Sequence, residues 1–289
     1  MTLSYDGTRF HGWQVQPNGI SVQEELQRSL SLLLRENISV TGAGRTDTGV
    51  HARMMVAHFD YSGKWKEESG ERSEEIVEID CQQLAYKLNR ILPQDIAVQC
   101  VEPVDDDMHA RFSAVARTYY YYVHTFKLPF LRHYSCELHY NLDFSLMKQA
   151  AAILLEYEDF GAFCKSHADV KTTLCHVMKA EWTETSPGQW RFEIKANRFL
   201  RNMVRAVVGT LIEVGRHRLT LDDFRRVIEG KRRTEAGESM PAKALFLEKI
   251  EYETPLSCVP SVASDQRSSA SPEGAHYPAS TLMKPPRGQ

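Results

Sequence analysis

Segments with the periodicity of β-strands and of amphipathic helices alternate through residues 1–253, and this alternation limits the possible folds more than any other feature. Ser21 is followed three residues later by Glu24, the arrangement in which each side chain caps the backbone of the other at a helix start. Apolar residues such as Leu26 and Leu30 then recur at helical spacing. The sequence therefore predicts a capped amphipathic helix here.

Later segments continue the alternation, since β-branched and aromatic runs favour strands and runs with helical spacing favour helices. We expect strands at 38–41, 54–59, 96–104, 114–125, 173–185, 189–196 and 245–252, and helices at 81–91, 142–155, 200–214 and 221–229. This order predicts an α+β fold, an antiparallel sheet with helices packed on one face.

A boundary near residues 102–107 would divide the core into two halves of similar size, 1–104 and 105–253. Residues 64–78 are polar, charged and without periodicity, which predicts an insertion in a loop. Residues 254–289 are rich in Ser, Pro and Ala and have no apolar pattern, so we expect a disordered tail.

Several classes of protein are disfavoured by the sequence. It has no run of about 18 apolar residues, and its first residues are not a basic and then apolar secretory signal, so we expect a cytoplasmic protein without a membrane span. The six cysteines are scattered without a C-x-x-C pair, and the histidines are not clustered. This spacing predicts no metal site.

The net charge is only −3, but the charges are unevenly placed. Residues 195–233 are strongly basic, whereas residues 67–80 are strongly acidic. A basic stretch in an acidic protein is typical of a surface that binds a polyanion. Charge alone still favours the simpler interpretation, a set of solvated helix faces.

The most informative segment, residues 42–52, reads Gly-Ala-Gly-Arg-Thr-Asp-Thr-Gly-Val-His-Ala. Its glycines permit sharp turns and close approach to a ligand, but no Gly-Lys-Ser/Thr ending of a phosphate-binding loop follows. In an extended chain Arg45 and Asp47 would point to the same side, and a nearby arginine keeps a carboxylate ionised and oriented for nucleophilic attack. Spacing alone favours a surface turn in which Asp47 caps the backbone.

This segment resembles the signature loop of the TruA-type pseudouridine synthases, Gly-Arg-Thr-Asp-Ala-Gly-Val-His, and departs from it only at Thr48, where alanine is usual. Further matches follow in family order over about residues 3–250. They lie at residues 5–8, 10–14, 21–24, 109–114, 117–119, 199–205 and 241–247.

The resemblance implies the pseudouridine synthase fold, with two similar half-domains, a mixed and mainly antiparallel sheet, helices on one face and an active-site cleft between the halves. It implies the isomerisation of uridine to pseudouridine in the anticodon stem-loop of tRNA, at positions 38, 39 and/or 40, by a homodimer. The reaction exchanges no electrons, so it implies no cofactor. The chemical route stays open between attack on the uracil ring at C6, attack on the ribose and deprotonation of the ribose.

The resemblance also implies roles for single residues. Asp47 would be the catalytic carboxylate, paired with Arg205 from the segment 200–214. Tyr119 would stack on the flipped uracil and assist the final removal of the C5 proton, Arg45 would fill the space that the base leaves, and Leu245 would line the uracil pocket. Without the resemblance, Tyr119 and Leu245 would be interpreted as sheet residues packed in the core, and Arg205 as a solvated arginine.

Four further arginines are candidates for contacts with the phosphates of the RNA: Arg198, Arg201, Arg216 and Arg218.

Two alternative functions remain open at this point. The chain could be a catalytically inactive RNA-binding relative, although such a copy would be free to lose Arg45, Asp47, Tyr119 or Arg205. It could also be a nucleosidase or glycosidase with paired carboxylates, but the glycine-rich segment contains only one acid.

Overall fold

The computed structural model describes residues 1–62, 79–165 and 171–257, and the segment Met1–Val259 forms one compact unit. The loop insertion expected at 64–78 and nearly all of the tail expected at 254–289 lie outside the described residues. The division of the core into half-domains 1–104 and 105–253 stays a prediction, because the strands of both segments join one sheet.

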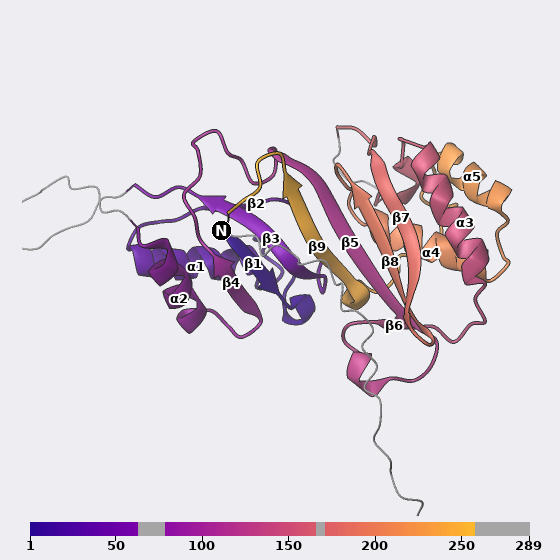
Figure 1. Ribbon diagram of the computed structural model, residues 1–289, viewed down its shortest axis with the longest axis horizontal. Helices are drawn as coiled ribbons and strands as arrows, with labels where there is room; N and C mark the ends of the chain where they lie inside the picture. Colours follow the sequence, from indigo (N-terminus) through magenta and orange to yellow (C-terminus); the bar gives the residue numbers. More distant parts are fainter. Residues whose placement is uncertain (63–78, 166–170, 258–289) are drawn as a thin grey trace, which may run out of the picture. The chain divides into compact units, whose positions relative to one another are not determined.

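The described strands form a sheet of nine, in which seven strands follow the order β4-β1-β3-β9-β5-β8-β7, while β2 pairs with β3 and β6 with β5 (Figure 1). Their bounds are β1 Thr2–Tyr5, β2 Val40–Gly42, β3 His51–Phe59, β4 Ile96–Cys100, β5 Ala114–His124, β6 Cys136–Glu137, β7 Val177–Ser186, β8 Gln189–Ala196 and β9 Leu245–Tyr252. All pairs are antiparallel except β3 with β9 and β5 with β6. The predicted mixed, mainly antiparallel sheet is confirmed.

Five α-helices lie in two groups within the described residues. Helices α1 (Val22–Leu34) and α2 (Cys81–Ile91) contact each other near β2 and β4, and α3 (Phe144–Ile153), α4 (Met203–Gly215) and α5 (Leu221–Gly230) contact one another near β7 (Figure 1). The predicted cap of α1 is present, since Ser21 Oγ accepts from Glu24 N and a Glu24 carboxylate oxygen accepts from Ser21 N. The predicted α+β fold is confirmed.

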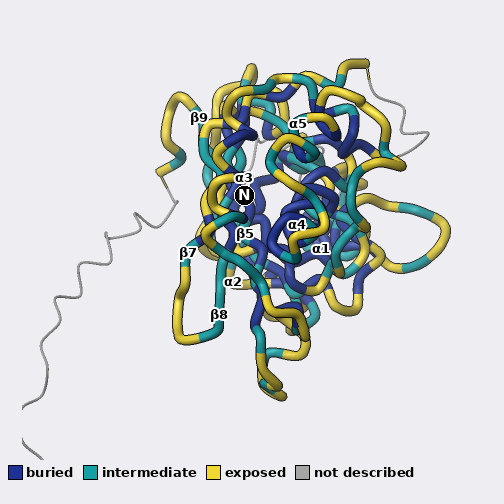
Figure 2. Tube along the Cα trace, turned by 90° about the vertical axis from the view of Figure 1, so that its right-hand side faces the viewer, coloured by how far each residue is buried: buried dark blue, intermediate teal, exposed yellow. Residues whose placement is uncertain are grey.

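Alternation of the strand residues gives the sheet one apolar and one mixed face. On β5 the side chains of Tyr119, Tyr121 and Val123 are buried with the helix core, whereas Tyr120 and Tyr122 on the other side stay half-buried. The helices cover the apolar face. In Figure 2 the interior strands are buried, and the turn between β7 and β8 is exposed.

Several predicted elements have different bounds in the structure, among them α4, β7 and β4. Helix α4 starts at Met203 rather than at 200, because Asn202 adopts the left-handed backbone conformation with φ of 68°. Strand β7 starts at Val177 rather than at 173, because Cys175 N donates to Glu158 O in a loop contact. Strand β4 ends at Cys100 rather than at 104.

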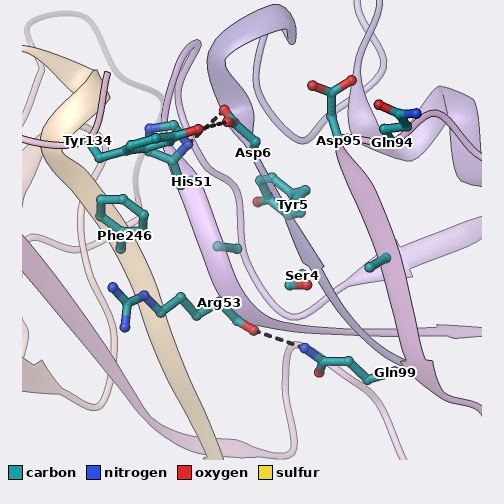
Figure 3. A pocket seen from close by; sticks show the side chains of 12 residues that line it. Ser4, Tyr5, Asp6, His51, Arg53, Gln94, Asp95, Gln99, Tyr134 and Phe246 are labelled. Atoms are coloured by element: carbon teal, nitrogen blue, oxygen red, sulfur yellow. Dashed lines mark hydrogen bonds and ion pairs between the residues drawn. The ribbon is translucent and has the colours of Figure 1, made fainter. Parts of the chain in front are cut away.

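On the mixed face, residues of β1, β3, β4 and β9 line a hollow of about 480 Å³ (Figure 3). The Asp6 carboxylate accepts hydrogen bonds from Thr8 N (2.9 Å) and from the Tyr134 hydroxyl (2.7 Å). The Gly7 backbone N–H donates to His51 Nδ1 (3.0 Å), and the His51 ring stacks on Phe246 of β9 at 4.6 Å. This network fixes the start of β3 against its neighbours.

No helix within the three described ranges is long and apolar enough to cross a membrane.

The hydrogen bonds to Asp6 generate a prediction about pH. Burial opposes ionisation of this carboxylate, but the hydrogen bonds from Thr8 and Tyr134 outweigh burial and hold the pKa of Asp6 below its ordinary value of 3.8. The ionised carboxylate therefore stabilises the fold above about pH 4, and this stabilisation is lost as pH falls through the lowered pKa. We expect Asp6→Asn to lower the Tm by about 2–4 °C at pH 7, and the difference to narrow towards pH 3.

Thermal unfolding of both proteins across this pH range makes the measurement, with the exposed Asp105→Asn as the control that leaves Tm unchanged at each pH. An equal loss of Tm at pH 7 and pH 3 would show that the charge of Asp6 contributes nothing.

Candidate active site

The loop that joins β2 to β3, residues 43–50, contains Asp47 and is hydrogen-bonded to the N-terminal segment. We call it the Asp47 loop. The Tyr5 hydroxyl lies 2.8 Å from Thr46 Oγ1, and Trp13 N donates to Thr46 O at 3.1 Å. Both contacts are with the residue directly before Asp47, so they fix the backbone that presents the carboxylate.

Two glycines allow this close contact between backbones. A Cβ atom on Gly12 would lie 2.4 Å from Thr46 O, and Gly12 has a φ of +86°. A Cβ atom on Gly7 would lie 2.0 Å from Val50 O, at the other end of the loop. Any side chain at either position would displace the Asp47 loop, which explains in physical terms why glycine stands at both.

The Asp47 carboxylate faces two arginines from the segment around the start of α4. Its Oδ2 lies 3.5 Å from Arg205 Nη1, and its Oδ1 lies 3.9 Å from Arg201 Nε. The Arg205 side chain is 21% exposed and the Arg201 side chain 61% exposed, so one partner is enclosed and the other is open to solvent. The pairing of Asp47 with Arg205, which the resemblance implied, is therefore present in the geometry.

Arg205 is fixed by a segment that we call the strap, residues 240–243, directly before β9. Three carbonyl groups of the strap each accept a hydrogen bond from a different element. Arg205 Nε of α4 donates to Met240 O (2.5 Å), the Tyr121 hydroxyl of β5 to Pro241 O (2.9 Å), and His51 Nε2 of β3 to Lys243 O (3.0 Å). The strap thus ties together the helix and strands that surround Asp47.

Tyr119 and Leu245 lie on the face of the sheet that carries the core. Tyr119 is buried, its ring packs edge-on against Phe199 at 5.0 Å, and burial raises its pKa to about 12, with the negative charge of Asp47 acting in the same direction. The phenol is therefore neutral in the free protein. Leu245 pairs directly with Tyr121 across β5 and β9, which places it on the same face as Tyr119.

Arg117, which the sequence did not single out, holds the Asp47 loop to the sheet. Its Nη1 donates to the carbonyl oxygens of Ala114 and Asn197, both at 2.8 Å. Its Nη2 donates to Ala43 O (3.1 Å), the first carbonyl of the Asp47 loop, and to Arg111 O (2.6 Å). Burial lowers the pKa of Arg117, yet four carbonyl acceptors compensate the buried cation. The available signal was its place in the segment 117–119, which matches the family.

The other predicted arginines are placed differently. Arg45 is exposed and makes no ion pair with Asp47, whose partners in the described chain are Arg201 and Arg205. Arg198 is half-buried near Arg117.

Arg216 and Arg218 both pair with Glu213 at the far end of α4, at 2.8 and 3.3 Å. The Arg216 guanidinium also lies 3.7 Å from the centre of the Tyr140 ring. These two arginines are therefore engaged within the protein and lie apart from Asp47.

This arrangement is suited to nucleophilic attack on an electron-poor centre within an anionic ligand. The carboxylate is oriented by two cations at distances longer than the 2.7–2.9 Å of a tight charge-assisted hydrogen bond, so its oxygen lone pairs stay accessible. The neutral Tyr119 phenol and the exposed Arg201 side chain lie nearby. Within the described residues, no cluster of three or more His, Cys, Asp or Glu side chains could hold a metal ion.

The site is thus an isolated carboxylate on a glycine-rich loop of an α+β sheet, with two arginines beside it. Comparison with known proteins identifies the family. The sequence profile of the tRNA pseudouridine synthase family matches residues 1–113 and 150–253.

Named relatives agree with the profile. The tRNA pseudouridine synthase A of Bacteroides fragilis is 54% identical over 250 residues, which cover 86% of this chain and 94% of the relative. The proteins of the same name from Bacteroides thetaiotaomicron and Bacillus subtilis are 54% and 38% identical, over 86% and 87% of this chain and 88% and 98% of their own lengths. The chain belongs to the tRNA pseudouridine synthase family.

The hydrogen bonds of Arg117 predict that it positions the Asp47 loop. In Arg117→Lys, one ammonium group cannot reach the four carbonyl groups, and the loop loses its anchor at Ala43. We expect kcat for the modification of tRNA to fall by about 100-fold, since a displacement of about 1 Å at a reacting group has this effect. KM should stay within about threefold, because the lysine keeps the positive charge.

Steady-state kinetics on a tRNA transcript measure both constants, with Tm as the check on folding. Arg191→Lys is the matched control, because Arg191 is an arginine on the neighbouring strand β8 that faces the other side of the sheet and contacts Glu193. A wild-type kcat in Arg117→Lys would contradict the assignment.

Proposed function

We propose that this chain isomerises uridine to pseudouridine in the anticodon stem-loop of tRNA, at positions 38, 39 and/or 40, with Asp47 as the catalytic nucleophile. The observation that carries the proposal is the position of Asp47, on the family's signature loop and facing Arg205 across the start of α4. The relatives from Bacteroides fragilis and Bacillus subtilis are named as enzymes of this kind.

The reaction breaks the C1′–N1 glycosidic bond, turns the uracil, and joins C5 to C1′, after which the proton on C5 is transferred to N1. The atoms of substrate and product are the same and no electrons are exchanged, so the reaction itself requires no redox cofactor. Asp47 would form a transient bond either to C6 of the uracil or to the ribose, or would act as a base on the ribose. Each route needs an ionised carboxylate with an accessible oxygen, and the long contacts to Arg201 and Arg205 leave one.

The uridine must leave the RNA stack before it can reach Asp47, at a cost of a few kcal/mol. Tyr119 would stack on the flipped uracil, while the exposed Arg45 would occupy the vacated space. Because the raised pKa keeps the Tyr119 phenol neutral, stacking and hydrogen-bond donation suit it better than removal of the C5 proton from the resting state. Leu245, on the same face, would line the pocket.

Among the candidate phosphate contacts, Arg198 and Arg201 are the better placed. Arg201 is largely exposed beside Asp47, and Arg198 lies near Arg117. For Arg216 and Arg218 to bind phosphate, they would first have to give up their contacts with Glu213. We further propose that the protein acts in the cytoplasm as a homodimer and uses no small-molecule cofactor.

The test of the proposed function is incubation of the purified protein with an unmodified tRNA transcript, without metal or cofactor, followed by mapping of pseudouridine through carbodiimide-induced stops of reverse transcription. We expect stops on the 3′ side of the anticodon stem-loop. Asp47→Asn, which keeps the shape but not the charge, should abolish them and leave tRNA affinity within about threefold of wild type.

Retained turnover in Asp47→Asn would remove Asp47 as the nucleophile. Binding without stops on several tRNAs would instead support the alternative, a catalytically inactive RNA-binding relative. Release of free uracil, rather than a product of unchanged mass, would indicate a nucleosidase.

A second prediction separates the candidate phosphate contacts. Each phosphate contact that is lost lowers the slope of log K against log salt concentration by about 0.7–0.9. We expect this change in Arg201→Gln, because Arg201 is exposed beside the reacting carboxylate. Arg218→Gln, at the far end of α4, should leave the slope unchanged.

Titration of a labelled anticodon stem-loop over a series of salt concentrations gives the slope for each variant. If the slope changes with Arg218→Gln and not with Arg201→Gln, the RNA lies along the far end of α4, and the assignment is reversed.

A further inference from the structure

An exposed phenylalanine stands beside the Asp47 loop and has no part in the chemistry described above. Phe112, in the loop between β4 and β5, is 76% exposed, a high exposure for a large apolar side chain. An exposed aromatic ring is common on protein surfaces and needs no explanation by itself. Phe112 is distinguished by the hydrogen bonds that hold its backbone and by the residues around its ring.

The loop at residues 109–114, which we call the Phe112 loop, is held by its own hydrogen bonds. The backbone N–H groups of Arg111 and Phe112 both donate to His109 Nδ1, at 3.1 and 3.2 Å. Ser113 N donates to His109 O at 2.9 Å, and His109 N donates to Ser113 Oγ at 3.0 Å. The backbone under Phe112 is therefore fixed before any ligand arrives.

Two histidine rings in successive tilted and edge-on contacts support Phe112. The Phe112 ring lies 4.3 Å from the His109 ring, which lies 4.7 Å from the His58 ring of β3. Burial and the neighbouring His109 lower the pKa of His58, so its Nδ1 stays unprotonated and accepts from Ala110 N at 3.1 Å. Phe112 thus has a rigid backing that extends into the sheet.

The Phe112 loop and the Asp47 loop are joined through a single nitrogen atom. Arg117 Nη2 donates both to Arg111 O (2.6 Å) and to Ala43 O (3.1 Å). The residue before Phe112 and the first residue of the Asp47 loop are therefore neighbours. The Phe112 loop therefore lies against the start of the Asp47 loop.

The surroundings of Phe112 are cationic. The positive charges of Arg111 and Arg198 add to burial in lowering the pKa of Arg117, so each of these two guanidinium groups lies within electrostatic reach of Arg117. Within the described part of the chain, Arg111 and Arg198 form no ion pair with a carboxylate. The Arg111 guanidinium lies 5.6 Å from the centre of the Phe112 ring. The ring is thus bordered by unneutralised positive charge.

We propose that Phe112 is a stacking platform for an unpaired nucleobase of the RNA substrate, next to the uridine that enters the site, with Arg111 and Arg198 on the flanking phosphates. This proposal rests on the proposed function and adds the place where the neighbouring nucleotide binds. A flat aromatic ring bordered by arginines is the arrangement that binds single-stranded nucleic acid.

The experiment uses the full-length protein and a hairpin RNA of the anticodon stem-loop that carries 2-aminopurine next to the target uridine. Stacking on Phe112 quenches the 2-aminopurine fluorescence of the bound RNA. We expect Phe112→Ala to weaken binding by about 5- to 150-fold and to relieve the quenching, since base stacking on an aromatic ring contributes about 1–3 kcal/mol. Phe112→Trp should restore both, because tryptophan offers a larger ring.

The salt dependence separates the ring from the arginines. Phe112→Ala removes no charge and should leave the slope of log K against log salt unchanged, whereas Arg111→Gln should lower it by about 0.7–0.9. Phe130→Ala is the matched control. Phe130 is 94% exposed and follows β5 at the end opposite Phe112, so its removal should change neither affinity nor quenching.

Wild-type affinity and quenching in Phe112→Ala would overturn the proposal, as would an effect that Phe112→Trp does not restore. A change in sedimentation without a change in RNA affinity would assign the ring to contact with a second copy and would also overturn it. The proposed function fails separately, if the wild-type protein makes no pseudouridine, because binding and quenching are measured without turnover.

Discussion

The short parallel contact between β3 and β9 is the constraint on which the rest of the site depends. β9 is the last strand in the sequence, yet it lies between β3 and β5 (Figure 1). Its register pairs His51 with Phe246 and Ala52 with Leu247, directly after the Asp47 loop. The strap before β9 is thereby brought next to that loop, and the strap carbonyls can then hold Arg205 against Asp47.

Charge around Asp47 is organised by backbone carbonyls rather than by carboxylates. Arg117 donates to four carbonyl groups and, among the described residues, pairs with no carboxylate, whereas Arg205 donates to one carbonyl group beside its contact with Asp47. By contrast, Arg216, Arg218 and Arg225 pair with glutamates. A protein with a net charge of −3 can therefore keep a strongly positive site, since what matters locally is how each arginine is partnered.

The parts of the fold and site that depend on local sequence patterns could be predicted from the sequence. The helix cap at Ser21 and the strand alternation on β5 are local patterns, and the structure confirms them. The signature loop allowed Asp47 to be proposed as the catalytic residue because its residues are contiguous in the sequence. The expected neighbour Arg45 does not pair with Asp47, because the residues before Asp47 do not continue β2 as a strand and a turn follows at Gly49, whose φ is +78°.

Arg117 and the strap are positioned by contacts between residues far apart in the chain, so no local sequence pattern predicts these contacts. Arg117 and its acceptor Ala43 are separated by 74 positions, and His51 and Lys243 by 192. The same limit applies to the basic stretch at 195–233, which the sequence presents as one group. The structure divides it, because α4 separates Arg201 and Arg205 at its start from Arg216 and Arg218 at its end by about 18 Å.

The two arginines beside Asp47 differ in their exposure to solvent. Arg205 is enclosed and hydrogen-bonded to the strap, so it keeps its place whether or not RNA is present. Arg201 is open to solvent and its contact with Asp47, at 3.9 Å, is too long for a hydrogen bond. An incoming phosphate would compete for Arg201 and not for Arg205. Binding of the RNA would therefore leave Asp47 oriented by Arg205 alone, which requires no movement of the Asp47 loop.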